Sequence, residues 1–430
     1  MNGSSVMVSA TKSTNKSRTI SSGKATLLAV LYLASTFLVS ARQYNILEQH
    51  RRQVQALVVE GQETALRHTS LRATGSSTAA SSSNNNKAKK PWCRTPEDYN
   101  HGEWVKHDDI VAYPYLSDPD PVWGPQCSQL QSDFLAGNGT LPAFLQYKWH
   151  PRNCQLALQD HSWNQQAFCS SLQNKVLGVS GDSMSQQFVH SIMGHSRGRI
   201  EVDEWWKFVV ETPWKQMDEA IPDHWVKLKV PLCDHDTIDY NVTLLYQRWD
   251  KYHGGDADRA ALTQLAQESD YLLLNWGVHY QQWADMEQAM EDMTSVLKQH
   301  WTKQPERLFW RSTNVAHANC DTATGPIIAE AVDDSDNQKN INPMNASVII
   351  HPEYHTQEIL WQDEYIVKPL LSKKLPHTTL LRIEETTLQR PDGHRVVGHK
   401  GTQDCLHYCE PGPIDHWAEL FYHYAVALEI

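Results

Sequence analysis

Short apolar runs alternate with helical patterns along the second half of the chain. Mostly apolar runs, typical of buried strands, lie at residues 175–179, 270–275, 307–311, 348–350 and 379–383. Apolar residues at helical spacing lie at 184–193, 285–300 and 417–428. Strands that alternate with helices build layered folds, so the pattern predicts an α/β protein, a layered α/β/α fold with a mainly parallel sheet.

Other parts of the chain lack this alternation. Residues 92–171 are rich in Trp, Pro and Cys, which predicts an irregular, disulfide-stapled N-terminal segment. Residues 200–260 hold many Trp and His residues without a clear period, and we expect loops with short strands there. The polar, acidic stretch 332–342 is expected to form a surface loop.

The N-terminal region predicts a membrane anchor. Residues 1–24 carry basic residues and no acid, and residues 25–41 are uncharged and largely apolar. We expect a cytoplasmic tail at 1–24, a signal-anchor helix at 25–41, a partly disordered stem at 42–90 and a luminal domain at 91–430. The alternative is a cleaved signal peptide with Val39 and Ala41 before the cut, which would give a secreted protein.

Composition agrees with a luminal or extracellular domain. The 430-residue chain has a net charge of −12 and no basic stripe, so a nucleic-acid partner is not expected. All eight cysteines follow the apolar segment and none forms a CxxC pair, which favours four disulfides whose pairing the sequence leaves open. No metal site is expected. Glycosylation acceptors stand at Asn138, Asn241 and Asn345.

A candidate nucleophile follows the first predicted strand. Gly181-Asp182-Ser183 places a serine where a strand turns into a helix, and a nucleophilic serine needs both a base and donors for an oxyanion. Asp404 and His407, three residues apart, can share one turn, so that the carboxylate orients the imidazole. Two other pairs compete for this role in the sequence: Asp392 with His394, and Asp415 with His416.

Further candidates follow other predicted strands. Asn275 ends one apolar run and Arg311 ends the next. Because sites in parallel sheets lie beyond the carboxyl ends of the strands, we expect these side chains near Ser183.

Several motifs occur together in a fixed order. In chain order they are Gly102-x-Trp104-Val105, Lys148-Trp149-His150-Pro151-Arg152-Asn153-Cys154, Gly181-Asp182-Ser183, Leu274-Asn275-Trp276-Gly277, Arg311 with His317, Arg390-Pro391-Asp392-Gly393-His394, and Asp404-Cys405-x-His407-x-Cys409-x-Pro411-Gly412 with Asp415-x-Trp417. The set resembles the trichome birefringence-like family of polysaccharide O-acetyltransferases, a branch of the PC-esterase superfamily with an SGNH/GDSL-esterase-like fold. The resemblance runs from about Cys93 to Tyr424.

This resemblance implies roles for individual residues. Ser183 would be the nucleophile, His407 the general base and Asp404 its orienting partner. The oxyanion donors would be the Ser183 backbone N–H with, as a hypothesis, Gly277 and Asn275. Arg311 and His317 would hold donor or acceptor, with structural ion pairing and packing as the alternative for both. Cys320 would pair with Cys405, and Cys93 with Cys154.

The chain departs from the family pattern in three places that bear on substrate. Gln186-Gln187-Phe188 stands where the family commonly has Arg-Asn-Gln, and Asn314-Val315-Ala316 replaces the Ser-Pro before the later histidine. Val278-His279-Tyr280 stands at the end of the Asn275 motif that is Trp-rich in the family. These changes affect the expected acceptor and donor contacts. They leave Ser183, Asp404 and His407 intact.

The expected activity is O-acetyl transfer to a polysaccharide or glycan hydroxyl in the Golgi lumen through an acetyl-serine intermediate. It would require an acetyl donor, acetyl-CoA or another carrier, and no bound cofactor. A second membrane protein that supplies the acetyl groups is a possible partner. Two alternatives stay open: a glycan acetyl esterase with the same residues, since water can attack the same acyl-enzyme, and a non-catalytic glycan-binding protein of the same fold.

Overall fold

The computed structural model of the protein describes residues 90–107, 127, 130, 133, 134, 136–157, 163–196, 226–235, 238–327, 355–394 and 404–428. All of them belong to the second of two units into which the chain divides, Ala88–Ile430. The expected tail, anchor and nearly all of the stem lie outside the described residues, as do loop 332–342, strand 348–350 and Asn345. Within the described residues, no helix is both long and apolar enough for a membrane crossing.

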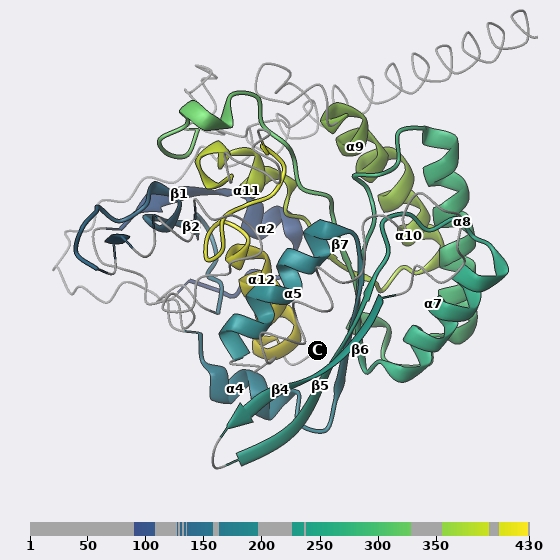
Figure 1. The fold of residues 1–430 in the computed structure, drawn as a ribbon. Helices are drawn as coiled ribbons and strands as arrows, with labels where there is room; N and C mark the ends of the chain where they lie inside the picture. The colour runs from purple at the N-terminus through teal and green to yellow at the C-terminus, as the bar shows by residue number, and fades with distance from the viewer. Residues whose placement is uncertain are drawn as a thin grey trace, which may run out of the picture. The chain divides into compact units, whose positions relative to one another are not determined.

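Six strands form the central sheet in the order β4-β5-β3-β6-β7-β8 (Figure 1). Their bounds are β3 Val176–Gly181, β4 Val226–His235, β5 Ile238–Arg248, β6 Tyr271–Asn275, β7 Leu308–Arg311 and β8 Thr379–Leu381. Neighbouring strands run parallel except β4, which pairs antiparallel with β5. The mainly parallel sheet predicted from the sequence is therefore confirmed.

Helices cover both faces of this sheet, and Figure 1 shows α7 and α8 on one side and α5 and α12 on the other. Their bounds are α5 Ser183–Ser196, α7 Asp256–Glu268, α8 Trp283–His300 and α12 Asp415–Tyr422. Because alternate strand residues face opposite sides, Leu273 and Phe309 join one core while Leu272, Leu274 and Leu308 join the other. The predicted layered α/β/α fold is confirmed.

The amphipathic pattern of α8 explains how one helix attaches to the sheet. Met286, Met290, Met293 and Leu297 recur at helical spacing and are almost completely buried in the core that α8 shares with α7. The sequence predicted this helix over 285–300, and it begins two residues earlier at Trp283.

The largest difference from the sequence-based expectation lies in residues 200–260. Instead of loops with short strands, β4 and β5 form a long antiparallel hairpin, and α7 begins at Asp256. The signal was available, because apolar and polar residues alternate from Val226 to Leu232. The many Trp and His residues in this region made the alternation along β4 hard to recognise.

Four disulfides use all eight cysteines. The pairs are Cys93–Cys154, Cys127–Cys409, Cys169–Cys233 and Cys320–Cys405. The first and last are the two pairs that the resemblance implied. Three of the four pairs tie the segment before β3 to itself or to later parts of the chain. That segment contains α2 Pro96–Asn100, β1 Gly102–Lys106, η1 Ala143–Leu145, β2 Tyr147–Pro151 and α4 Gln165–Ser171.

Short elements connect and follow the last sheet strands. They are η4 Pro305–Arg307, η5 Cys320–Thr322, α9 Thr356–Gln362, η8 Asp363–Val367, α10 Lys368–Lys374, α11 Glu384–Leu388, η9 Pro391–Gly393 and η11 His423–Ala427. The helix predicted over 417–428 corresponds to α12 and its continuation η11.

Gly178 lies in the middle of β3, where a side chain has no room. A Cβ there would overlap the Ser269 hydroxyl and lie 2.9 Å from Ser269 Cβ. We expect Gly178→Ala to lower the free energy of unfolding by about 1–3 kcal/mol, because overpacking forces neighbours to shift. Denaturant unfolding measures this. The matched control is Gly255→Ala, where no atom lies within 4 Å, and an equal loss in both variants would contradict the explanation.

Candidate active site

Ser183 is the first residue of α5 and follows directly on the turn that ends β3. Gly181 lets the turn approach β6, since a Cβ at this position would overlap the Asn275 carbonyl oxygen. The Asp182 carboxylate accepts a hydrogen bond from the Met184 N–H at 2.9 Å, which fixes the first turn of the helix. The strand, tight turn and helix predicted around Ser183 are therefore present.

Ser183, His407 and Asp404 form a chain of hydrogen bonds. His407 Nε2 lies 2.8 Å from Ser183 Oγ, and His407 Nδ1 lies 3.0 Å from Asp404 Oδ2. Because an ionised carboxylate can only accept, Nδ1 carries the proton and Nε2 is left as the acceptor that faces the serine hydroxyl. Such an arrangement can remove a proton from Ser183 during attack on a carbonyl carbon.

Asp404 also fixes the backbone of the same turn. Its Oδ1 accepts hydrogen bonds from the N–H groups of Leu406 at 3.2 Å and His407 at 3.1 Å. The carboxylate thus holds both the ring and the main chain of His407. This local geometry explains why the two residues are spaced three apart.

The competing Asp–His pairs have other partners. Asp392 forms a buried, bidentate ion pair with Arg390 at 2.8 and 2.9 Å. Asp415 accepts from Ser191 Oγ and lies 3.0 Å from His195 Nε2, both on α5. These carboxylates therefore fasten parts of the fold to one another.

His317 and His394 lie behind His407. His394 Nδ1 is 3.0 Å from the His407 carbonyl oxygen, and its Nε2 is 2.7 Å from His317 Nδ1. His317 Nε2 donates to the Leu388 carbonyl at 2.8 Å. Burial lowers the pKa of His317 to about 4 and also lowers the pKa of His394. His317 is completely buried, so the expectation that it contacts substrate directly is not met.

Arg311 links the ends of β7, β6 and α5 from inside the protein. Its Nη2 donates to Asn275 Oδ1 at 2.7 Å and to Ser185 Oγ at 3.2 Å, and its guanidinium lies over the Trp417 ring at 4.5 Å. Burial lowers the pKa of Arg311 to about 10, so it stays charged near neutral pH. The side chain is completely buried, which again differs from the expected contact with substrate.

Asn275 and Gly277 lie at the end of β6, as expected for this edge of the sheet. The Asn275 amide donates to the Arg311 carbonyl at 2.9 Å and to Thr313 Oγ1 at 3.2 Å. Both amide hydrogens are thus directed at protein acceptors, so this side chain does not point a donor at Ser183. Gly277 packs against Thr313, where a Cβ would lie 2.8 Å from Thr313 Cβ.

Three buried polar residues near this edge were not predicted. Ser185 receives the Arg311 hydrogen bond, Gln187 is completely buried on α5, and Asp363 accepts from the Thr313 N–H at 2.8 Å. The signal for Gln187 was its spacing, because residues four apart lie on the same face of a helix and Ser183 is four residues earlier. No sequence pattern marks Asp363.

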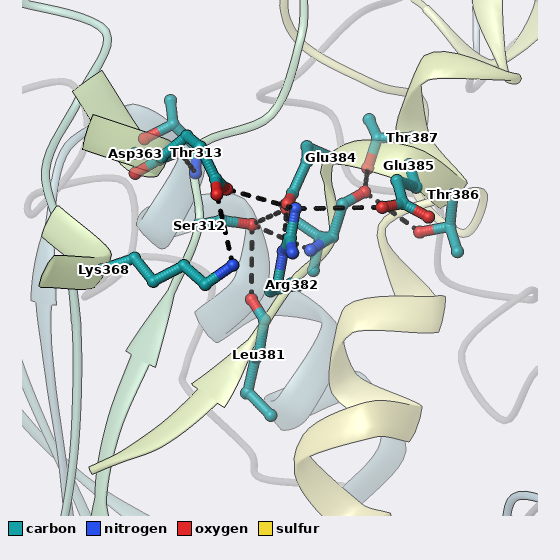
Figure 2. Close-up of polar contacts among 12 residues, drawn as sticks. Ser312, Thr313, Asp363, Lys368, Leu381, Arg382, Glu384, Glu385, Thr386 and Thr387 are labelled. Carbon is teal, nitrogen blue, oxygen red and sulfur yellow. Dashed lines mark hydrogen bonds and ion pairs between the residues drawn. The ribbon is translucent and has the colours of Figure 1, made fainter. Parts of the chain in front are cut away.

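A polar network supports the end of β7 from the other side (Figure 2). The Ser312 hydroxyl donates to Glu384 and accepts from the Ile383 N–H, while Arg382 pairs with Glu384. Figure 2 shows Asp363 beside Thr313 and facing the same cluster. Burial raises the pKa of Asp363 to about 8, and the nearby Glu384 carboxylate adds to the rise.

This raised pKa of Asp363 predicts a pH dependence of stability. The folded state favours the protonated acid, so its contribution is complete below about pH 4 and is lost as the pH rises through about 8. Asp363→Asn keeps an oxygen acceptor for Thr313 and stays neutral. We expect the variant to match wild type at about pH 4 and to become the more stable protein as the pH rises from there to about 8, in urea unfolding. A wild type that is the more stable protein at the higher pH would contradict this assignment.

One family model and two curated relatives match the chain. The family is PC-Esterase, a GDSL/SGNH-like acyl-esterase family found in Pmr5 and Cas1p, and the match covers residues 256–424. It includes Asp404 and His407 and begins after Ser183. Protein trichome birefringence-like 26 of Arabidopsis thaliana is 22% identical over 319 residues, 64% of this chain and 67% of the relative.

The second relative is also from Arabidopsis thaliana. Xyloglucan O-acetyltransferase 2 is 24% identical over 319 residues, 64% of this chain and 71% of the relative. The sheet order, the disulfides and both relatives agree with the fold and the family that the sequence motifs indicated. The comparisons support an esterase or acetyltransferase type of activity. The PC-esterase match and the two relatives together support a place in the trichome birefringence-like family, and the sheet agrees with an SGNH-like fold.

Proposed function

We propose that this protein transfers an acetyl group to a hydroxyl of a polysaccharide or glycan, with Ser183 as nucleophile, His407 as general base and Asp404 as the residue that orients His407. The observation that carries the proposal is the 2.8 Å contact between His407 Nε2 and Ser183 Oγ, together with the Asp404 carboxylate on the opposite ring nitrogen. The atom of a base that accepts a proton must lie within about 2.6–3.2 Å of the heavy atom that carries this proton.

The proposed reaction has two displacements. In the first, Ser183 Oγ attacks the acetyl carbonyl carbon while its proton passes to His407 Nε2. The tetrahedral intermediate collapses, the donor's leaving group takes the proton, and acetyl-Ser183 forms. In the second, His407 takes the proton of the acceptor hydroxyl, whose oxygen attacks the acetyl carbon. Ser183 then leaves and regains the proton.

The oxyanion of each tetrahedral intermediate needs hydrogen-bond donors. We propose the backbone N–H groups of Ser183 and Gly277 for this role. The Asn275 amide has protein partners, so we assign it to holding the ends of β6 and β7 together. The acetyl donor is proposed to be acetyl-CoA or another acetyl carrier, supplied across the membrane by a second protein.

The acceptor and the compartment follow from the relatives and the cysteines. Since one relative is named a xyloglucan O-acetyltransferase, xyloglucan is the first acceptor to test. Four disulfides favour an oxidising compartment. We propose a type II Golgi membrane protein with its catalytic domain in the lumen. Asn138 and Asn241 are exposed and suited to glycosylation there.

A second candidate is a glycan acetyl esterase. The matching family model describes acyl-esterases, which favours hydrolysis by the same residues. Water would replace the acceptor hydroxyl in the second displacement, with the same proton transfer to His407. The two activities differ only in what attacks acetyl-Ser183.

The test uses the full-length chain from a eukaryotic host, an activated acetyl ester, and xyloglucan and N-glycan oligosaccharides. We expect acetylated oligosaccharide by mass spectrometry. Ser183→Ala should abolish it, and Asp404→Asn should lower kcat by about 10³–10⁴-fold, because the imidazole loses its orienting carboxylate.

The control variant is Ser295→Ala, which removes a hydroxyl on α8 that bonds only locally to the Glu291 carbonyl. Its activity should match wild type. Ester cleavage without acetylated sugar would favour the esterase. If ester turnover survives in Ser183→Ala, Ser183 is not the nucleophile.

A further inference from the structure

The helix that carries Ser183 also binds the main chain of Tyr408, the residue after His407. Gln187 lies one turn after Ser183 on α5 and is completely buried. Its Nε2 donates to the Tyr408 carbonyl at 2.8 Å, and its Oε1 accepts from the Tyr408 N–H at 3.1 Å. One side-chain amide thus satisfies both main-chain groups of Tyr408, as a neighbouring strand would.

This pair of bonds bridges two distant parts of the chain. Gln187 and Tyr408 are 221 residues apart, and Ser183 and His407 are 224 apart. The two contacts run side by side between α5 and the turn that contains His407. Because Ser183 and Gln187 belong to one rigid helix, the position of Tyr408 on Gln187 sets the distance from His407 to Ser183.

We propose that Gln187 is a positioning residue that sets the contact between Ser183 and His407; this inference rests on the proposed function. It does not touch the reacting atoms. Its role needs a donor and an acceptor in one planar group at this length of side chain. Glutamine supplies both, an ionised glutamate supplies only acceptors, and leucine supplies neither.

Other groups bind the main chain of His407 itself, while Gln187 binds the main chain of Tyr408. Asp404 binds the N–H of His407, and His394 binds its carbonyl oxygen. The disulfides at Cys405 and Cys409 anchor the turn to the rest of the fold. The hydrogen bonds from Gln187 add a direct link between this turn and the helix that carries Ser183.

The Gln187→Glu variant makes the need for both a donor and an acceptor measurable as a pH dependence of activity. The ionised glutamate cannot donate to the Tyr408 carbonyl and repels it, while the protonated acid can donate and restores both bonds. Burial raises the pKa of such a carboxyl above its ordinary value of about 4.3. The activity of the variant relative to wild type should therefore recover as the pH falls.

The titratable groups around Tyr408 are the same in both proteins. They are His394, which stacks on the Tyr408 ring, His407 with Asp404, His190 with Glu410, and the Arg390–Asp392 ion pair. The pH dependence that both proteins share drops out of the ratio of variant to wild type at each pH. The activity ratio therefore reports the titration of the carboxyl introduced at position 187.

The experiment measures Ser183-dependent turnover of an activated acetyl ester by full-length wild type, Gln187→Glu and Gln187→Leu from about pH 5 to about pH 8. We expect kcat of Gln187→Leu to fall about 10²-fold at every pH, because a misplacement near 1 Å costs about that much. Gln187→Glu should match it at about pH 8 and recover about tenfold or more by about pH 5.

The matched control is Gln362→Glu. Gln362 is also a buried glutamine whose amide donates to a main-chain carbonyl, that of Tyr280 at 3.0 Å, and within the described part of the chain it makes no hydrogen bond to the turn of His407. It should lower the melting temperature while its activity ratio stays flat with pH. A flat ratio for Gln187→Glu would overturn the proposal, and so would full activity of Gln187→Leu.

A crystal structure of Gln187→Leu separates this inference from the proposed function. We expect the Ser183 Oγ to His407 Nε2 distance to exceed the 2.8 Å of wild type. An unchanged distance would overturn the positioning role, even if wild type shows no Ser183-dependent turnover, which would defeat the proposed reaction alone. If Gln187→Leu does not fold, the isosteric Gln187→Glu structure at low and high pH decides.

Discussion

The hydrogen bond between Ser183 and His407 is the interaction around which this fold is arranged. It joins the helix that follows β3 to a turn 224 residues later, and neither part alone can hold the other in place. Strong helix packing supplies the frame, since α5 and α12 share one core on the same face of the sheet. The turn that carries His407 is fastened onto this frame by shorter polar contacts.

Those polar contacts add to backbone hydrogen bonds of the same segment, from the Cys409 N–H to the Gly393 carbonyl at 2.8 Å and from the His317 N–H to the Cys405 carbonyl at 3.1 Å. Buried N–H and C=O groups must find partners, and around His407 the partners are side chains: Asp404, His394 and Gln187. Each bond adds modestly to stability, but leaving one of these groups unpaired would cost about 1–3 kcal/mol. The same side chains therefore pair the buried backbone groups and fix the position of the His407 imidazole ring.

At the carboxyl edge of the sheet, buried charged groups are likewise paired with side chains. Arg311 is buried at the end of β7, and it is acceptable there because Asn275, Ser185 and the face of Trp417 surround it. On the far side of β7, Ser312, Glu384 and Arg382 form a second network (Figure 2). The strand ends that flank Ser183 are thus held by ionic and amide groups in a mostly apolar core.

The sequence by itself determined the mainly parallel sheet, the helix after Ser183 and the fact that Asp404 and His407 can share one turn, because each depends on neighbours in the chain. That this Asp–His pair, and neither of the two competing pairs, faces Ser183 was decided by the tertiary structure. A strand covered on both faces must be apolar throughout, and two residues three apart can share a turn. Only the tertiary structure decided the burial of Arg311 and His317 and the two hydrogen bonds between Gln187 and Tyr408. A hydrogen bond such as that from Arg311 to Ser185 spans 126 residues, and contacts of this range leave no periodicity or spacing in the sequence.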